Sequence, residues 1–228
     1  MKKLLTYFTK LELISWCVSA ALIILAFLLF DRGNPLALCA SLVGVTSLVF
    51  NAKGNPIGQA LMLLFSLLYA VISLTFSYYG EMLTYLGMTA PMSAFSLLSW
   101  LKNPYEKNKA QVKINRLTKR EFFLSFLLTA AVTILFYFPL AYLKTANLAL
   151  STFSVATSFL AAYLTFRRSP YFALAYAAND AVLIALWTLA SFVTPAYLSV
   201  VVCFLAFLFW DCYGFFSWRK TQKQQSEE

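Results

Sequence analysis

The chain of 228 residues has no histidine, only four cysteines and few charged side chains. Its share of Asp, Glu, Lys and Arg is 12%, against roughly 25% in soluble domains. The cysteines lie inside apolar stretches without metal-ligand spacing, so we expect small buried side chains and neither disulfides nor metal ligands. The sequence also lacks a nucleophile with a plausible base, a phosphate-binding glycine loop and a Walker motif. These absences argue against an enzyme, a resident cofactor and self-driven ATP-dependent pumping.

Apolar residues take the place of the missing charges, at 61% hydrophobic and 18% aromatic. A soluble domain of this length has no core large enough to bury so much apolar surface, whereas lipid solvates it directly. The net charge of +9 would suggest nucleic acid in a soluble protein. Here the Lys and Arg residues lie in the gaps between apolar runs. The composition therefore predicts an all-α integral membrane protein with the lipid bilayer, and no nucleic acid, as its partner.

Eight apolar stretches predict helices that cross the bilayer, since most of them reach the ~20 residues that ~30 Å of hydrocarbon requires. Helices are expected because every backbone polar group must be satisfied within the membrane. The first stretch follows Lys2 and Lys3, as in a signal peptide, but it is long and has no clear cleavage site, so we interpret it as a retained span. The stretches cover residues 13–30, 34–50, 56–78, 82–101, 121–143, 146–166, 170–192 and 195–218.

The basic residues are divided unequally between the two sides of the predicted membrane domain. With eight spans, only Arg32 and Lys144 of the 18 Lys and Arg residues fall on one side. The positive-inside rule then predicts that both termini and the central loop lie in the cytoplasm. Termini on the same side require an even number of spans, so the charges support the count of eight independently.

The two halves of the chain resemble each other at four ordered places, and the offset between them rises from 109 to 118 residues. The matches are residues 9–13 with 118–122, 34–38 with 147–150, 55–56 with 169–170, and 99–100 with 217–218. Four spans separate equivalent points, so both copies have the same orientation. We therefore expect two parallel repeats related by an axis along the membrane normal, an arrangement found in transporters.

Asp180 is the most informative acid, because it lies near the middle of a predicted span. At helical spacing Tyr176, Asn179, Asp180, Leu183 and Trp187 share one face. A charge at the centre of a membrane helix costs ~2.5–3.5 kcal/mol, and no Lys or Arg within the spans is available to neutralise it. This favours a ligand-facing carboxylate over one that only fixes packing against a neighbouring helix.

The rest of the predicted site is less well determined. Asp211 lies closer to the cytoplasmic end, where water or Arg219 can satisfy it, so a structural and a functional role both stay open. When the two halves are aligned with an offset of 114 residues, Ser66 matches Asp180 and Ser73 matches Trp187. The predicted substrate-binding residues are Gln59, Ser66, Tyr69, Tyr176, Asn179, Asp180, Trp187, Trp210 and Asp211. Such a cavity suits an amphipathic solute with a flat ring, hydroxyl groups and a positive charge.

Several short motifs, taken in order, resemble the PnuC family of vitamin-precursor transporters. The second half contributes YAAND at 176–180, Leu186-Trp187, Tyr213-Gly214 and Trp218, and the first half contributes Gly44, Lys53-Gly54, YGE at 79–81, Pro91 and Trp100. The resemblance spans residues 34–218. It departs from some members at Tyr176, where they have Trp, and at Asp180 and Trp210, where they have Asn.

This resemblance implies facilitated diffusion of nicotinamide riboside in a bacterial inner membrane, with a cytoplasmic kinase that traps the vitamin by phosphorylation. It also implies a fold related to the SWEET sugar carriers, with two three-helix bundles and a linker helix. The implied division is an N-terminus with an extra first span (1–30), bundle one (34–101), a basic cytoplasmic loop (102–120), the linker helix (121–143), bundle two (146–218) and a cytoplasmic tail (219–228).

Three alternatives stay open at this point. Relatives in the family are specialised for thiamine or riboflavin, and thiamine is also a cation with an aromatic ring, so the charge of Asp180 does not separate it from nicotinamide riboside. A membrane scaffold subunit without transport of its own is a possibility from another class. The sequence also leaves open whether transport is coupled to protons and whether the protein forms a homo-oligomer.

Overall fold

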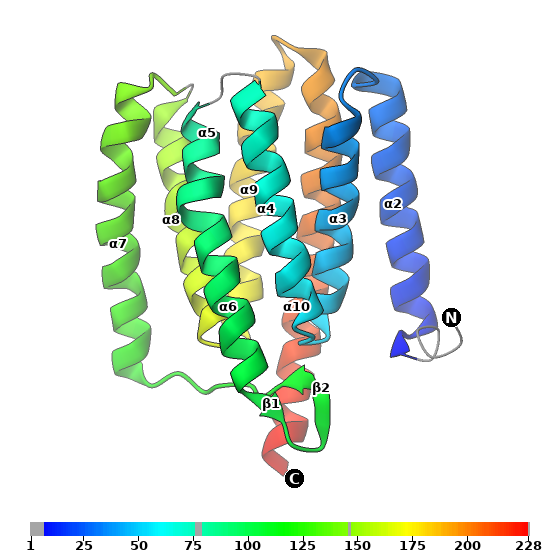
Figure 1. Ribbon diagram of the computed structural model, residues 1–228, viewed down its shortest axis with the longest axis vertical. Coiled ribbons are helices and arrows are strands. Elements are labelled where there is room, and N and C mark those ends of the chain that lie inside the picture. Colours follow the sequence, from blue (N-terminus) through cyan, green and yellow to red (C-terminus); the bar gives the residue numbers. More distant parts are fainter. Residues whose placement is uncertain (1–6, 76–78, 146, 228) are drawn as a thin grey trace.

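Helices account for nearly all of the structure, a computed structural model in which residues 7–75, 79–145 and 147–227 are described (Figure 1). The elements are α2 (Lys10–Phe30), α3 (Pro35–Ala52), α4 (Ile57–Thr75), α5 (Tyr79–Thr84), the π-helical turn η1 (Tyr85–Thr89), α6 (Ala90–Lys102), β1 (Pro104–Tyr105), β2 (Asn108–Val112), α7 (Lys119–Tyr142), α8 (Leu148–Phe166), α9 (Tyr171–Ser191), the 3₁₀ turn η2 (Pro195–Tyr197) and α10 (Leu198–Glu227). The prediction of a predominantly helical fold is confirmed, with a two-stranded hairpin in addition.

Among the described residues, seven helices are long and apolar enough to cross a membrane. The remaining predicted segment, residues 82–101, forms the three successive elements α5, η1 and α6, which together run along the bundle beside α4 and α8 (Figure 1). No single one of them reaches the length of a span, because the wider turn η1 separates the two α-helices. Residues 76–78 and 146, which belong to two predicted segments, lie outside the described residues.

The outer helices present a large apolar surface. On α7, Phe123, Leu135 and Phe138 are each more than 60% exposed, and on α2 Leu11 and Leu29 are exposed to a similar degree. Exposed apolar surface on this scale is unfavourable in water and marks a face that contacts lipid. α2 and α7 therefore lie at the periphery of the bundle, while α3, α4, α9 and α10 supply most of its core.

Helices α2 and α7 start with the same local structure. Each begins with a capping box, in which the hydroxyl of Thr9 or Thr118 accepts a hydrogen bond from the backbone N–H of the glutamate three residues later. The side chain of that residue, Glu12 or Glu121, accepts a hydrogen bond from the threonine N–H in return. The Thr-x-x-Glu spacing alone therefore accounts for where these two helices begin.

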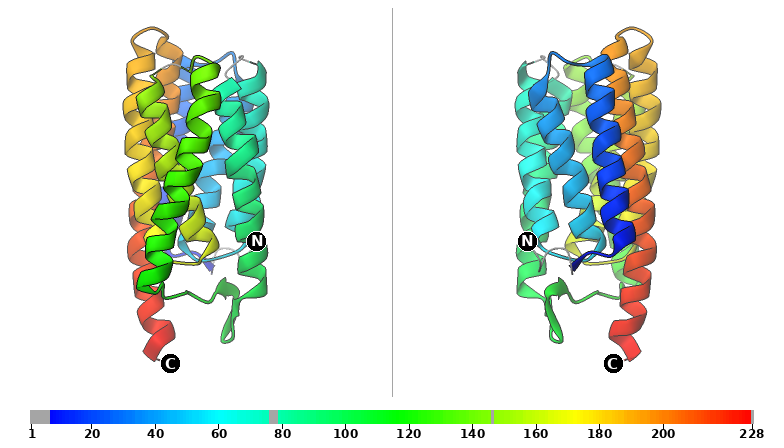
Figure 2. Two further views of the ribbon diagram at one scale, coloured as in Figure 1. Left: turned by 90° about the vertical axis from the view of Figure 1, so that its left-hand side faces the viewer. Right: turned by 90° about the vertical axis from the view of Figure 1, so that its right-hand side faces the viewer.

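Four features lie together at one end of the bundle, which we call the basic end (Figures 1 and 2). They are the α3–α4 turn at 53–56, the β-hairpin at 104–112, the α8–α9 turn at 167–170 and the C-terminal end of α10. The α2–α3 and α7–α8 turns, which contain Arg32 and Lys144, lie at the opposite end (Figure 1). This arrangement agrees with the alternation of loops that was predicted for eight spans.

The central loop and the tail are more ordered than the sequence suggested. Part of residues 102–120 forms an antiparallel hairpin, and Val112 of its second strand is fully buried. The tail predicted at 219–228 is helical to Glu227 as part of α10. Gln225 explains both observations, because its side-chain amide donates to the Val112 carbonyl (3.1 Å) and accepts from the N–H of Ile114 (2.8 Å).

Two glycines shape the α3–α4 turn at the basic end. Gly54 has a φ of 67°, in the left-handed region that other residues rarely adopt, and its carbonyl accepts a hydrogen bond from the N–H of Val112 (2.9 Å). Gly58 lets α4 approach the end of α3 closely. A Cβ atom at Gly58 would lie 2.2 Å from Oδ1 of Asn51 and 2.7 Å from its backbone nitrogen.

We therefore expect Gly58→Ala to destabilise the protein by about 1–3 kcal/mol, the usual cost of inserting an extra methyl into close packing. Thermal unfolding of the purified protein in detergent measures the effect. Gly33→Ala is the matched control, because no atom lies within 4 Å of its added Cβ. Equal melting temperatures for the two variants would contradict the close contact between α3 and α4.

Candidate functional site

A cavity lies in the middle of the bundle, with about 880 Å³ of empty space including its opening. Elements of both halves of the chain line it, from α3 to α10. Its polar and ionisable lining consists of Glu81, Thr84, Tyr85, Thr89, Thr145, Ser151, Ser154, Ser158, Tyr176, Asn179, Asp180, Trp187 and Asp211. No Lys or Arg is among the described residues that line it. The cavity is therefore acidic and aromatic.

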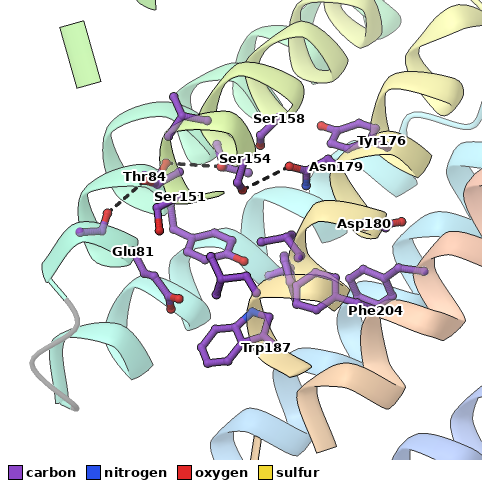
Figure 3. A pocket seen from close by; sticks show the side chains of 18 of the residues that line it. Glu81, Thr84, Ser151, Ser154, Ser158, Tyr176, Asn179, Asp180, Trp187 and Phe204 are labelled. Atoms are coloured by element: carbon purple, nitrogen blue, oxygen red, sulfur yellow. Dashed lines mark hydrogen bonds between the residues drawn. The ribbon is translucent and has the colours of Figure 1, made fainter. Parts of the chain in front are cut away.

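One face of α9 forms a wall of this cavity. Tyr176, Asn179, Asp180, Leu183 and Trp187 all line it, as their helical spacing predicts. The side chains of Asn179, Asp180 and Trp187 are at most 8% exposed. In Figure 3, Tyr176 and Asp180 lie on one side of the cavity. The helix begins directly after Pro170, whose ring lacks an N–H and suits a helix start.

The carboxyl group of Asp180 is incompletely satisfied by the protein. Its Oδ2 atom is buried and has no hydrogen-bond partner among the described residues, and none of their Lys or Arg side chains pairs with it. The Asp211 carboxyl lines the same cavity. One oxygen of Asp180 therefore stays available to a ligand.

Asn179 is oriented by the neighbouring helix α8. Its Oδ1 atom accepts hydrogen bonds from the hydroxyls of Thr157 (2.9 Å) and Ser154 (3.3 Å), and the latter is drawn in Figure 3. With the oxygen occupied, the amide nitrogen is left to donate. Asn179 can thus offer a donor to a ligand hydroxyl or carbonyl beside the acceptor of Asp180.

Aromatic rings surround these polar groups. Trp187 packs against Tyr197, with ring centroids 5.0 Å apart. On the other side of the cavity, Phe65 packs against Tyr85 and Phe207, with ring centroids 6.0 Å and 5.8 Å away. A flat cationic ring gains both from the negative faces of such side chains and from a nearby carboxylate.

Five of the nine predicted site residues line the cavity: Tyr176, Asn179, Asp180, Trp187 and Asp211. The other four are buried elsewhere. Gln59 donates to the Asn51 side chain (2.8 Å), Ser66 donates to the Met62 carbonyl (2.8 Å), Tyr69 packs against Phe65 and Tyr85, and Trp210 donates to Ser19 (3.2 Å). Helix α4 turns Met62 and Phe65 toward the cavity, and not Gln59, Ser66 and Tyr69.

Several lining residues were absent from the prediction. Ser151, Ser154 and Ser158 line the cavity from α8, and Glu81 and Thr84 line it from α5. The serines recur at i, i+3 and i+7, which places them on one helix face, so their spacing was a readable signal. Glu81 falls in the gap between the predicted spans 56–78 and 82–101, so it was not among the predicted site residues. In Figure 3 it lies across the cavity from Tyr176 and Asp180.

The cavity leads toward the end of the bundle opposite the basic end. A second hollow there shares six lining residues with it: Gly80, Glu81, Thr145, Ser151, Leu186 and Trp187. At the basic end, by contrast, Trp100, Trp218 and Phe172 are at most 2% exposed and pack together. The described conformation is therefore packed shut at the basic end.

Comparison with known proteins gives three findings. The sequence model described as "Nicotinamide mononucleotide transporter" matches residues 34–220. The "Nicotinamide riboside transporter PnuC" of Neisseria mucosa is 27% identical over 201 residues, which are 86% of this chain and 76% of that protein. A solved structure, "Crystal structure of the Vitamin B3 transporter PnuC", has a TM-score of 0.82 at 24% identity and covers 96% of this chain and 94% of its own. At that identity the structural likeness establishes the fold.

Proposed function

The chain belongs to the nicotinamide mononucleotide transporter family, and on this premise we propose that it carries nicotinamide riboside across the membrane by facilitated diffusion. As a member of the PnuC family it is a multi-pass membrane transporter and not an enzyme. The observation that carries the proposal is the unpartnered carboxyl oxygen of Asp180 in a cavity lined by aromatic rings.

The chemistry of nicotinamide riboside matches these groups. Its pyridinium ring is flat and positively charged, which suits Asp180 together with Tyr176 and Trp187. Its ribose hydroxyls and its amide both donate and accept hydrogen bonds, which suits Asn179 and the hydroxyl of Ser158. A neutral sugar would leave the carboxylate without a counter-charge, so the cavity favours a cationic heteroaromatic solute.

The charges of the cavity also favour a riboside over a mononucleotide. A nucleotide adds a phosphate group, which in proteins is usually held by Arg, Lys or a helix N-terminus. The cavity instead presents Glu81, Asp180 and Asp211 and, among its described lining residues, no basic side chain. These carboxyl groups repel a phosphate, and no basic side chain in the described lining compensates. The cavity therefore disfavours a mononucleotide.

Alternating access between two related bundles is the mechanism we propose. One support is that the two halves of the chain contain equivalent salt bridges at the basic end. Glu12 at the start of α2 pairs with Lys53 at the end of α3 (3.1 Å), and Glu121 at the start of α7 pairs with Arg167 at the end of α8. In both salt bridges the glutamate belongs to a Thr-x-x-Glu capping box. This repetition supports two parallel repeats.

A pair of tryptophans repeats in the same way. Trp100 at the end of α6 donates to the Thr165 carbonyl on α8 (2.9 Å), and Trp218 on α10 donates to the Asn51 carbonyl on α3 (2.7 Å). Each indole thus belongs to one proposed bundle and holds the helix end of the other. α10 packs against α3 as α6 packs against α8. These crossed contacts favour a SWEET-like core of α3–α6 and α8–α10, with α7 as linker and α2 as the extra helix.

The charges indicate which side of the membrane the cavity faces. The positive-inside rule favours a cytoplasmic location for the basic end and both termini. In that orientation the conformation described here is closed to the cytoplasm and its cavity leads toward the outside. We propose that rocking of the bundles separates Trp100 from Trp218, and that a cytoplasmic kinase traps the riboside by phosphorylation.

Uptake of radiolabelled nicotinamide riboside into liposomes that contain the purified protein tests the proposal. We expect the label to equilibrate, and to accumulate only when a riboside kinase and ATP are enclosed. Unlabelled riboside should compete, whereas nicotinamide mononucleotide, thiamine, riboflavin and glucose should not. Empty liposomes and liposomes with the Asp180→Ala variant are the controls.

Each other result would change the conclusion in a defined way. Uptake of labelled thiamine in place of riboside would keep the carrier and replace its substrate. Accumulation without a kinase, driven by an imposed proton gradient, would replace facilitated diffusion by proton coupling. A lack of uptake for every vitamin would favour a scaffold subunit.

A further inference from the structure

A second groove lies at the basic end, separate from the central cavity. The loop at 115–118, the first turns of α7 and α9 and the last turns of α10 form its walls. It holds about 1870 Å³ of empty space including its open side. Five basic side chains line it: Arg116, Lys119, Arg219, Lys220 and Lys223.

The positive charge of this groove is not neutralised by the protein. No carboxylate lines it within the described residues. Arg116, Lys119, Arg219 and Lys220 form no ion pair with the described carboxylates, and Lys223 reaches Glu227 only at 3.9 Å. The one acid near the start of α7, Glu121, is occupied by its own capping box and by Arg167. Five like charges that converge from three segments favour an anion between them.

The groove also borders the apolar belt of the bundle. Phe122 on α7 and Tyr171 on α9 line it and are each 43% exposed. The guanidinium of Arg219 lies over the ring of Tyr171 (5.9 Å), so a basic head and an aromatic face are adjacent. One turn along, Phe126 of α7 is 49% exposed on the apolar surface of the bundle. A ligand here meets cations at the water boundary and apolar side chains toward the hydrocarbon.

We propose that this groove binds an anionic phospholipid, with the phosphate group among the five basic side chains and an acyl chain along Phe122 and Phe126. Basic pockets between helices at a membrane surface are suited to such headgroups. The bound lipid would connect the proposed linker helix α7 to α9 and α10. A free phosphate would use the cations alone and would gain nothing from the apolar wall.

Native mass spectrometry and thermal unfolding of the delipidated full-length chain in detergent test the proposal. We expect phosphatidylglycerol to be retained and to raise the melting temperature, and phosphatidylcholine with the same acyl chains to do neither. In the double variant Arg219→Gln, Lys220→Gln the affinity for phosphatidylglycerol should fall roughly 30-fold. The matched control is Lys102→Gln, Lys109→Gln, which removes the same charge from exposed positions at the same end outside the groove.

Three outcomes would overturn the lipid assignment. An equal loss of affinity in the control would mean that the lipid responds only to overall charge. Equal effects of phosphatidylcholine and phosphatidylglycerol would remove the role of the anion. Stabilisation by inorganic phosphate as large as that by the lipid, and lost in the groove variant alone, would make the groove a site for soluble phosphate.

Discussion

Replacing Asp180 by asparagine is expected to lower riboside uptake roughly 10- to 100-fold, because a hydrogen bond to a charged group is worth about 1.5–3 kcal/mol. Asparagine keeps the size of the side chain, removes its charge and replaces one acceptor oxygen by an amide group that donates. The buried Oδ2 atom has no partner among the described residues, so the change costs the fold little. Initial rates of uptake into liposomes, at equal amounts of reconstituted protein, measure the effect.

Asp31→Asn is the matched control for this experiment. Asp31 caps the end of α2 and does not line the central cavity. The Asp31→Asn variant should therefore transport at the rate of the unmodified protein. The outcome that contradicts the prediction is an Asp180→Asn variant that transports normally. A variant that unfolds in detergent would instead show that Asp180 is needed for packing.

The largest effect on stability is expected for Trp218→Ala, at about 3–5 kcal/mol. The indole is 1% exposed, contacts the rings of Trp100 (5.3 Å) and Phe172 (4.8 Å), and donates to the Asn51 carbonyl. Alanine removes all of these contacts and leaves a cavity at the closed basic end. Chemical or thermal unfolding in detergent measures the loss.

Two further variants separate the causes. Trp218→Phe keeps most of the ring and loses the hydrogen bond, so it should cost about 1 kcal/mol for that bond in addition to a smaller packing term. Phe216→Ala removes an aromatic ring on the same helix that is 70% exposed, and it should have little effect. If Phe216→Ala and Trp218→Ala were equally damaging, the aromatic contact would not stabilise this end.

The membrane fold could be predicted from local sequence because its signals are local. A run of apolar residues long enough for the bilayer has to be a helix, since only a helix satisfies its own backbone groups in lipid. The Thr-x-x-Glu capping boxes at the starts of α2 and α7 are also local, but they entered the sequence reasoning only as a match between the two halves of the chain. The hairpin at 104–112 was missed, because the contacts that order it come from Gly54 and Gln225, which are far away in the chain.

The candidate site was predictable on α9 and not on α4. Helical spacing places Tyr176, Asp180 and Trp187 on one face, and a buried carboxyl without a basic partner indicates that this face meets a cavity. On α4 the predicted residues Gln59, Ser66 and Tyr69 do not line the cavity. Gln59 is taken up by a hydrogen bond to Asn51, and Met62 faces the cavity in its place.

The sequence by itself determined that this protein is a helical membrane protein with its basic loops at one end, because hydropathy and charge act on each segment separately. It also determined which residues share a helix face. Only the tertiary structure decided which face turns inward and which distant groups meet, as Glu81 does with Asp180 around one cavity and Arg116 with Lys220 in one groove. The physical reason is that periodicity defines the residues on a face, whereas the rotation of a helix about its axis depends on packing against neighbours that are remote in the chain.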